Sequence, residues 1–323
     1  MELIQLSQLD TDIINKTNFD LIITASGYER RSTYMVEKYS PDAEVKIALA
    51  FRENEKKAYR RQNDIYFQKK GYQFFYAASL QCTDIFAFLG DFFENGSLNN
   101  HKPVFKMLVD YSSMSKTWYA TLINYLLNAE LSFERVEIYF SYTPSFFSEP
   151  QKPKQVKYIG PLLHNNSRIV SKKPVALIMG LGYETGRTEA IKKALHPIVS
   201  YAFFPDPAFD DGYISSVSKQ NEHLLNKLPE NNIVRYPVAD LEGLRKEMTS
   251  LLLRLRLNYR VVIAPLGPKP FTLVSLCIAA QYPDVEVWRV SAGAKESIYE
   301  RIPSGDPIMY RVEFCADEEA DDY

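Results

Sequence analysis

The chain has 323 residues and a mass of 37.2 kDa, more than one small module needs, and this length predicts two domains. Its 38 basic and 40 acidic residues give a net charge of −2, which excludes the strongly basic balance of a protein that coats nucleic acid but leaves a local basic pocket open. Three distant cysteines and four histidines without metal-ligand spacing argue against a disulfide framework and a metal centre. Because the N-terminus lacks a signal-peptide pattern and no apolar run is long enough to span a membrane, we expect a cytoplasmic protein that binds no membrane.

Aromatic residues are abundant, with 22 Tyr and 19 Phe. Such rings can stack on nucleobases, but they also fill hydrophobic cores and interfaces. We expect core packing to account for most of them.

The first half of the chain alternates predicted strands and helices. Residues 21–41 predict a buried strand, a Gly-Tyr-Glu turn and a helix that ends before a proline. A helix is predicted at 60–71, another at 85–93, and a third after Lys116. The remaining strands of this half are predicted at 45–51, 72–79, 105–111 and 136–142.

The second half repeats this pattern in the same order. Residues 177–197 again predict a strand, a Gly-Tyr-Glu turn and a helix, and a Gln-Asn pair recurs at positions 62–63 and 220–221. Helices are predicted at 218–229 and 241–256, and strands at 199–204, 232–239, 260–265 and 285–291. These collinear matches indicate an internal duplication, although two unrelated halves with the same generic alternation would look similar.

Alternating strands and helices predict an α/β fold with two tandem Rossmann-like, doubly wound parallel-sheet domains. We place domain 1 at residues 1–145, a linker rich in Pro, Lys and Asn at 146–173, and domain 2 with an acidic tail at 174–323. The common strand order 3-2-1-4-5 would make the first and fourth strands neighbours. Ligands bind such sheets outside the carboxyl ends of these strands.

The loops after the first strands carry the first set of candidate binding residues. Glycine permits close approach to a ligand, a helix N-terminus suits phosphate, and arginine can bind phosphate oxygens. Arg31 is a further candidate for contacts to phosphate oxygens. The glutamates could accept a bond from a ribose hydroxyl or a base edge, or pair with the neighbouring arginine. The candidates are Gly27, Tyr28, Glu29 and Arg30 in the first half and Gly182, Tyr183, Glu184 and Arg187 in the second.

The loops after the fourth strands carry the second set. Hydroxyls, backbone amides and a lysine at a strand-to-helix turn can hold an anion, although serines there can also act as N-caps. Asn63 and Asn221 could read a base, or bond the neighbouring loop. The candidates in the loops are Asp110, Ser112, Ser113 and Lys116, then Gly267 and Lys269.

Asp110 at a strand end, followed by Ser112 and by Lys116 at a helix start, resembles the Asp-x-Ser/Thr-Gly-Gly-Thr-Lys loop of the CARF domain, with Ser113 and Met114 in place of the Gly-Gly pair. Two such domains in one chain look like the SAVED architecture. The resemblance implies a Rossmann-like sensor of cyclic oligonucleotides in bacterial antiviral defence, and some CARF proteins also cleave their ligand.

These observations give three functional hypotheses. The leading one is binding or sensing of a nucleotide or other phosphorylated ligand at the strand ends, with an effector or complex partner protein and with nucleic acid still open. The alternatives are a nucleotide hydrolase or phosphodiesterase that uses Asp110, Ser112 and Lys116, and a non-catalytic structural subunit of a defence complex. No cofactor is expected, because Thr185 occupies the third glycine position of the dinucleotide fingerprint.

Overall fold

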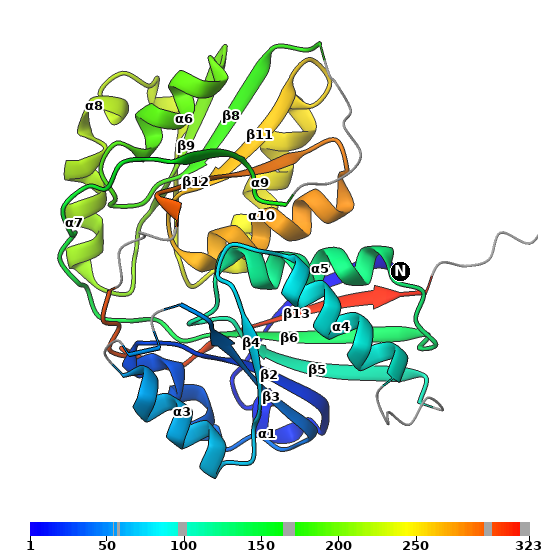
Figure 1. Cartoon of the computed structure of the whole chain (residues 1–323). Helices are drawn as coiled ribbons and strands as arrows, with labels where there is room; N and C mark the ends of the chain where they lie inside the picture. Colours follow the sequence, from blue (N-terminus) through cyan, green and yellow to red (C-terminus); the bar gives the residue numbers. More distant parts are fainter. Residues whose placement is uncertain (54, 57–58, 96–101, 164–171, 294–298, 317–323) are drawn as a thin grey trace, which may run out of the picture. The chain divides into compact units, whose positions relative to one another are not determined.

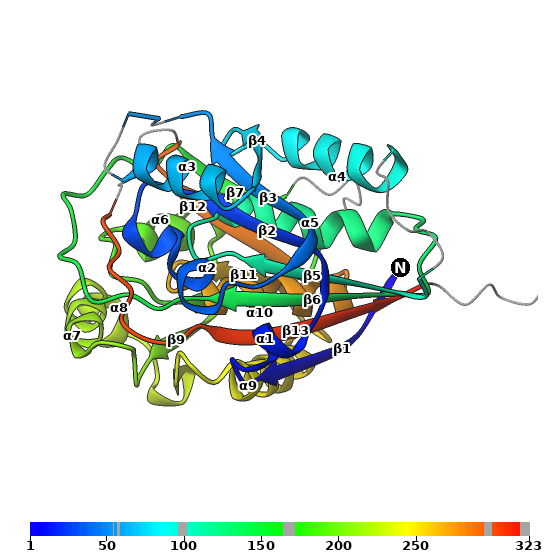
Figure 2. The ribbon, with the colours of Figure 1, turned by 90° about the horizontal axis from the view of Figure 1, so that it is seen from below.

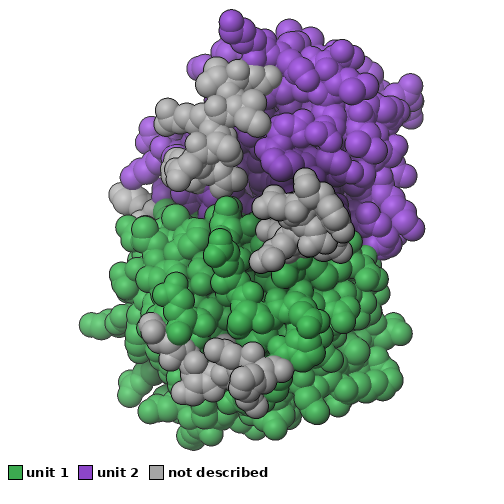
Figure 3. All heavy atoms as spheres, turned by 90° about the vertical axis from the view of Figure 1, so that its right-hand side faces the viewer, with its two compact units in different colours: residues 1–144, 305–323 green, residues 145–304 purple. Residues whose placement is uncertain are grey.

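A computed structural model describes residues 1–53, 55–56, 59–95, 102–163, 172–293 and 299–316, and the chain forms two compact units (Figure 3). Unit 1 comprises Met1–Pro144 and Gly305–Tyr323, and unit 2 comprises Ser145–Ser304. Each unit has a mostly parallel β-sheet flanked by helices, so the predicted α/β, Rossmann-like fold class is confirmed.

The sheet of unit 1 has seven strands in the order β1-β13-β6-β5-β2-β3-β4 (Figure 1). Its parallel part has the predicted order 3-2-1-4-5, read from β4 to β6. The parallel strands are β2 (Phe19–Ser26), β3 (Ala43–Phe51), β4 (Gln73–Ala77), β5 (Val104–Asp110) and β6 (Arg135–Tyr142). Two antiparallel strands extend this sheet beyond β6, namely β13 (Ile308–Cys315) and β1 (Glu2–Leu9).

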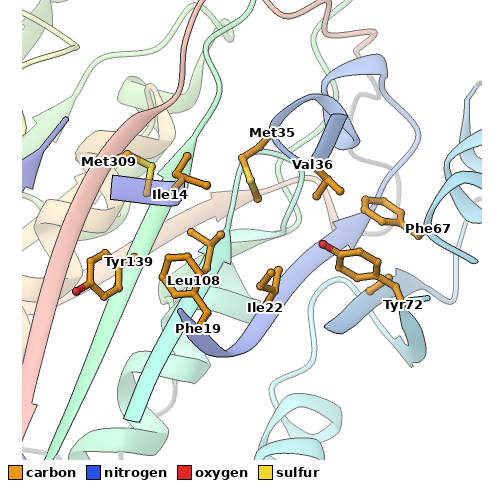
Figure 4. Packing of buried hydrophobic residues seen from close by; sticks show 11 residues of the cluster. Ile14, Phe19, Ile22, Met35, Val36, Phe67, Tyr72, Leu108, Tyr139 and Met309 are labelled. Carbon is orange, nitrogen blue, oxygen red and sulfur yellow. The ribbon is translucent and has the colours of Figure 1, made fainter. Parts of the chain in front are cut away.

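Helices cover both faces of the unit 1 sheet, which explains why every residue of β2 is buried. Figure 4 shows one face, where side chains from the strands pack against Ile14, Val36 and Phe67 of the first three helices. The helices of this unit are α1 (Ile13–Lys16), α2 (Tyr34–Tyr39), α3 (Arg60–Lys69), α4 (Thr83–Asn95) and α5 (Lys116–Asn128), with a 3-10 turn η1 at Arg30–Ser32.

Much of the aromatic content packs in unit 1, around α4 and α5. The ring of Phe93 lies 5.9 Å from that of Tyr125 and 5.4 Å from that of Phe105, and Phe105 lies 5.0 Å from Phe133. Figure 1 shows α4 and α5 together above the strands, on the face opposite α1 and α3. The expected role of aromatic residues in core packing is confirmed here.

The sheet of unit 2 has six strands in the order β10-β9-β8-β11-β12-β7, again with 3-2-1-4-5 in its parallel part. Its strands are β7 (Tyr158–Pro161), β8 (Val175–Gly180), β9 (Val199–Pro205), β10 (Ile233–Tyr236), β11 (Arg260–Pro265) and β12 (Glu286–Ser291). β7 is antiparallel to β12. The helices are α6 (Arg187–Leu195), α7 (Asp211–Gln220), α8 (Glu222–Leu225), α9 (Leu241–Leu255) and α10 (Lys269–Gln281), with a 3-10 turn η2 at Glu230–Asn232. Helices α6, α7 and α8 pack on one face of the sheet. Helices α9 and α10 are labelled in Figure 2, the view from below.

The structure corrects the predicted domain boundaries of 1–145, 146–173 and 174–323. β13 lies in the unit 1 sheet, where its register against β6 runs from Ile308 opposite Tyr142 to Cys315 opposite Arg135. The predicted linker contains β7 and belongs to unit 2. The sheets are therefore mixed and not purely parallel. Residues 317–323 of the acidic tail lie outside the described residues, and the duplication itself stays a prediction.

None of the helices among the described residues has the length and apolar character that crossing a membrane requires.

Candidate functional site

The two predicted loops of unit 1 are in direct contact at the carboxyl ends of β2 and β5, which are paired strands. The Ser113 hydroxyl donates a 2.7 Å hydrogen bond to Glu29 Oε1. Gly27 lies so close to the other loop that an added Cβ would be 3.0 Å from the Cβ of Ser113. The absence of a side chain at Gly27 therefore lets the two loops meet.

A buried ion pair fixes the first loop. Arg31 Nε donates to Glu29 Oε1 at 3.1 Å, and its Nη1 donates to the Thr143 carbonyl at 3.1 Å and to the Tyr142 hydroxyl at 3.3 Å. Burial opposes charge on Arg31, but the interactions with Glu29 and Tyr142 outweigh this and raise the pKa of the guanidinium. The Arg31 side chain thus points into the interior. Glu29 pairs with this arginine, which was one of the two roles considered for the glutamates.

Arg30 has the opposite orientation. Its side chain is exposed and its guanidinium lies 4.8 Å from the centre of the Tyr59 ring. Tyr28 is half-buried with its ring 5.6 Å from that of Phe51, which stacks on Trp118 at 4.1 Å. The loop therefore carries two side chains that each pack on an aromatic ring: Arg30 on Tyr59 and Tyr28 on Phe51.

The second loop of unit 1 begins with a buried turn. Asp110 Oδ1 accepts from the Ser112 backbone N–H at 3.0 Å and from the Ser112 hydroxyl at 2.5 Å. Ser112 Oγ also accepts from the backbone N–H of Thr143 at 2.7 Å, and its side chain is fully buried. Asp110 and Ser112 therefore fasten the end of β5 to the chain that leaves β6.

Helix α5 begins immediately after this turn, and its first residue is Lys116. The N-cap is Ser115, whose Oγ accepts from the Trp118 backbone N–H at 3.3 Å. The N-cap role that the sequence allowed for Ser112 or Ser113 thus belongs to Ser115. Lys116 is half-buried and stands at the positive end of the helix dipole.

Asn63 and Asn221 hold the glycine loops of their own units. Asn63 Nδ2 donates to the carbonyls of Gly27 and Glu29, both at 3.0 Å. Asn221 Nδ2 donates to the carbonyl of Gly182 at 2.7 Å and to that of Val217 at 2.8 Å. Both asparagines are buried. Their carboxamide N–H groups bond the neighbouring glycine loop, which was the alternative to reading a base.

In unit 2 the two predicted loops meet through their backbones. A Cβ added to Gly182 would lie 2.2 Å from the Leu266 carbonyl oxygen, and one added to Gly267 would lie 2.2 Å from the Leu181 carbonyl oxygen. Lys269, the first residue of α10, follows directly after Pro268 and is half-buried. It therefore takes the same place at a helix start as Lys116 does in unit 1.

The ion pair of this loop is less buried than its counterpart. Arg187 Nη2 lies 2.9 Å from Glu184 Oε2, and Arg187 also donates to the Val290 carbonyl. Gly186 has a positive φ of 79° at the N-cap of α6, a conformation that glycine adopts without strain. Glu184 and Arg187 thus contact each other, as the sequence analysis allowed for the glutamates.

Tyr183 contacts Arg301, which is not among the site residues predicted from the sequence. The Arg301 guanidinium donates to the Tyr183 hydroxyl and, at 2.9 Å, to the Tyr213 hydroxyl. It also lies 4.6 Å from the centre of the Tyr299 ring. One signal could have revealed it, since Tyr299-Glu300-Arg301 repeats the tripeptide Tyr28-Glu29-Arg30.

Among the described residues, no group of three or more His, Cys, Asp and Glu side chains could hold a metal ion. No known protein-family model matches the chain, and no curated protein matches it either.

Proposed function

We propose that each unit binds a nucleotide or another phosphorylated ligand at the carboxyl ends of its parallel strands. One observation carries the proposal. In both units the loops after the first and fourth parallel strands touch, and a lysine is the first residue of the helix that follows the fourth strand. The strand order places these loops where doubly wound sheets bind their ligands.

The chemistry of the loops suits a phosphate. Helices α5 and α10 each have 13 residues, so their N-termini carry the partial positive charge of a full helix dipole. Lys116 and Lys269 add an ammonium group at these N-termini, and Arg30 adds a guanidinium in unit 1. Backbone N–H groups and cations of this kind are a common solution for phosphate binding.

The contacts of Asp110 and Ser112 favour binding over hydrolysis. The Ser112 hydroxyl donates to Asp110 and accepts from the backbone of Thr143, and both side chains are buried. A hydroxyl that acts on a phosphodiester has to reach its substrate. The geometry of this turn therefore supports a structural role for the pair that the hydrolase hypothesis needs.

The resemblance of the loop from Asp110 to Lys116 to the CARF loop extends the proposal to cyclic oligonucleotides as ligands. In that case the protein would act in the cytoplasm as a sensor in antiviral defence and would pass its signal to a partner protein.

Isothermal titration calorimetry of the full chain with ATP, a cyclic oligoadenylate and a short oligonucleotide tests the proposal. We expect at least one probe to bind, and Lys116→Ala plus Lys269→Ala to weaken it tenfold or more, since a charge-assisted contact contributes roughly 1.5–3 kcal/mol. Lys16→Ala plus Lys173→Ala is the matched control, because these exposed lysines precede β2 and β8 at the opposite ends of the strands. No binding by any probe, or equal loss in both double variants, contradicts the proposal.

A further inference from the structure

Arg301 belongs to a segment that is fixed to unit 2 by contacts along its length. The Phe146 backbone N–H donates to the Ile302 carbonyl at 3.0 Å, and the Ser148 hydroxyl donates to the Glu300 carbonyl at 3.0 Å. An isolated bridge joins Ser145 to Pro303. Segments 145–148 and 300–303 thus run side by side in opposite directions, and they hold Arg301 in one place.

The Arg301 side chain reaches the glycine loop through a group of aromatic rings. Its guanidinium lies 5.8 Å from the centre of the Tyr183 ring and 6.0 Å from that of Tyr213. The two tyrosine rings are 5.7 Å apart, and Phe147 packs against both. Rings and phenol oxygens therefore surround the guanidinium and hold it in position.

The glycine loops of the two units differ in where an arginine comes from. The glycine loop of unit 1 reads Gly-Tyr-Glu-Arg and ends on Arg30, which lies on the ring of Tyr59. The loop of unit 2 reads Gly-Tyr-Glu-Thr, so Thr185 occupies the position of Arg30. Arg301 places a guanidinium beside the unit 2 loop, where Thr185 provides none, and this guanidinium also lies on a tyrosine ring.

We propose that Arg301 binds the phosphate of the unit 2 ligand, and that Tyr183 and Tyr213 position it for this contact. The inference rests on the proposed function of unit 2 and adds to it the residue that recognises the anion. A guanidinium held in advance loses little side-chain entropy when a phosphate binds, so its hydrogen bonds contribute more fully to affinity.

The tyrosines are suited to this positioning role. Burial raises the pKa of Tyr183, an effect that the nearby charge of Arg301 partly offsets, so the phenol stays neutral at physiological pH. A neutral phenol accepts a hydrogen bond from the guanidinium without cancelling its positive charge. A positively charged guanidinium at the carboxyl edge of β8 attracts anions.

The test uses ATP as the probe and the full chain carrying Lys116→Ala, which lowers binding in unit 1. In this background we expect Arg301→Gln to weaken ATP binding about tenfold, measured by calorimetry. Adding Thr185→Arg to Arg301→Gln should restore much of the affinity, because it returns the arginine to the place it has in unit 1. Arg256→Gln is the matched control, since Arg256 also lies on a tyrosine ring, 4.8 Å from the centre of Tyr282, and follows the end of α9.

The salt dependence of ATP binding provides a second readout that a purely structural role would not change. Loss of a direct charge contact should make the affinity of the Arg301→Gln protein less sensitive to salt. If Arg301→Gln leaves ATP binding unchanged, or if its loss is not rescued by Thr185→Arg and its salt sensitivity equals that of the parent, the inference is wrong while the proposed function stands. If the Lys116→Ala parent binds neither ATP nor the cyclic oligoadenylate nor the short oligonucleotide, both are wrong for unit 2.

Discussion

The two units bring their loops together at the same place in the sheet, but they do so by different means. In unit 1 the contact runs through side chains, with Ser113 on Glu29 and Glu29 on the buried Arg31. In unit 2 it runs through the backbone, where Gly182 and Gly267 each leave room for a carbonyl oxygen of the other loop. The same strand order is thus compatible with a polar network in one unit and with steric fit in the other.

This difference also changes which part of the chain supplies the arginine beside each glycine loop. In unit 1 the network holds Glu29 and Arg31 in the interior, whereas the neighbouring Arg30 is exposed and lies on the ring of Tyr59. In unit 2 the backbones occupy the space between the loops, and the cation beside Tyr183 comes from the distant residue Arg301. Two substitution experiments test this comparison directly, and a third tests a buried polar contact of unit 1 alone.

The largest effect is expected for Arg31→Leu. The Arg31 and Glu29 side chains are 6% and 9% exposed, so the substitution leaves a buried carboxylate without its partner. We expect unit 1 to lose about 3–5 kcal/mol of stability. The corresponding Arg187→Leu in unit 2, whose partner Glu184 is 32% exposed, should cost only about 1 kcal/mol. Hydrogen exchange measured by mass spectrometry reports each unit separately, and equal losses in both would show that the buried pair of unit 1 contributes no more stability than the more exposed pair of unit 2.

For the second pair of substitutions, at Gly267 and Gly27, we expect the larger loss of stability in unit 2. In Gly267→Ala the new Cβ meets the Leu181 carbonyl oxygen at 2.2 Å, and because this neighbour is backbone we expect a cost of about 3 kcal/mol in unit 2. In Gly27→Ala the nearest atom is the Ser113 Cβ at 3.0 Å, and the cost in unit 1 should be about 1 kcal/mol. The same exchange measurement compares them. A larger loss for Gly27→Ala would mean that steric fit is the tighter constraint in unit 1.

The smallest effect concerns the response of unit 1 to alkaline pH. Burial, together with the hydrogen bond to Glu137, raises the pKa of Tyr139 to about 12. The unfolded chain has a tyrosine pKa of about 10, so the stability that the neutral phenol contributes is complete below about pH 10 and is lost as the pH rises toward 12. The difference in unfolding free energy between the natural protein and Tyr139→Phe should therefore shrink by about 1 kcal/mol between pH 9 and pH 11. A constant difference, measured by urea unfolding at each pH, would show that Tyr139 titrates normally.

The parallel core of both units was predictable because its strands are continuous apolar runs. The predicted strands at 105–111, 199–204 and 260–265 agree closely with β5 (Val104–Asp110), β9 (Val199–Pro205) and β11 (Arg260–Pro265). The antiparallel strands were missed, since nothing local states that residues 308–315 pair with a strand some 170 positions earlier. The single helix expected at 218–229 is divided, with α7 ending at Gln220 and Asn221 turned toward the glycine loop.

The candidate site was predictable to the level of loops but not of side-chain directions. The glycines could be located because they follow predicted strands at turns, and the helix-start lysines because one recurs at the same place in both halves. Arg31 and Arg30 are adjacent in the chain, yet one is buried and the other exposed, and only the surrounding structure decides which is which. Arg301 lies more than 100 positions from Tyr183, so the repeated Tyr-Glu-Arg tripeptide could single out this residue but could not predict its contact with the glycine loop.

The position of β13 has a consequence for the order in which the molecule can be made. A ribosome releases the chain from the N-terminus, so all strands of unit 2 have been synthesised before residues 308–315 emerge. Until then β6 has one unpaired edge, and β1 has no neighbour, because β13 is its partner in the sheet. The unit that begins first is therefore the one that is completed last, and a nascent chain halted before residue 308 would carry a finished unit 2 beside an open sheet in unit 1.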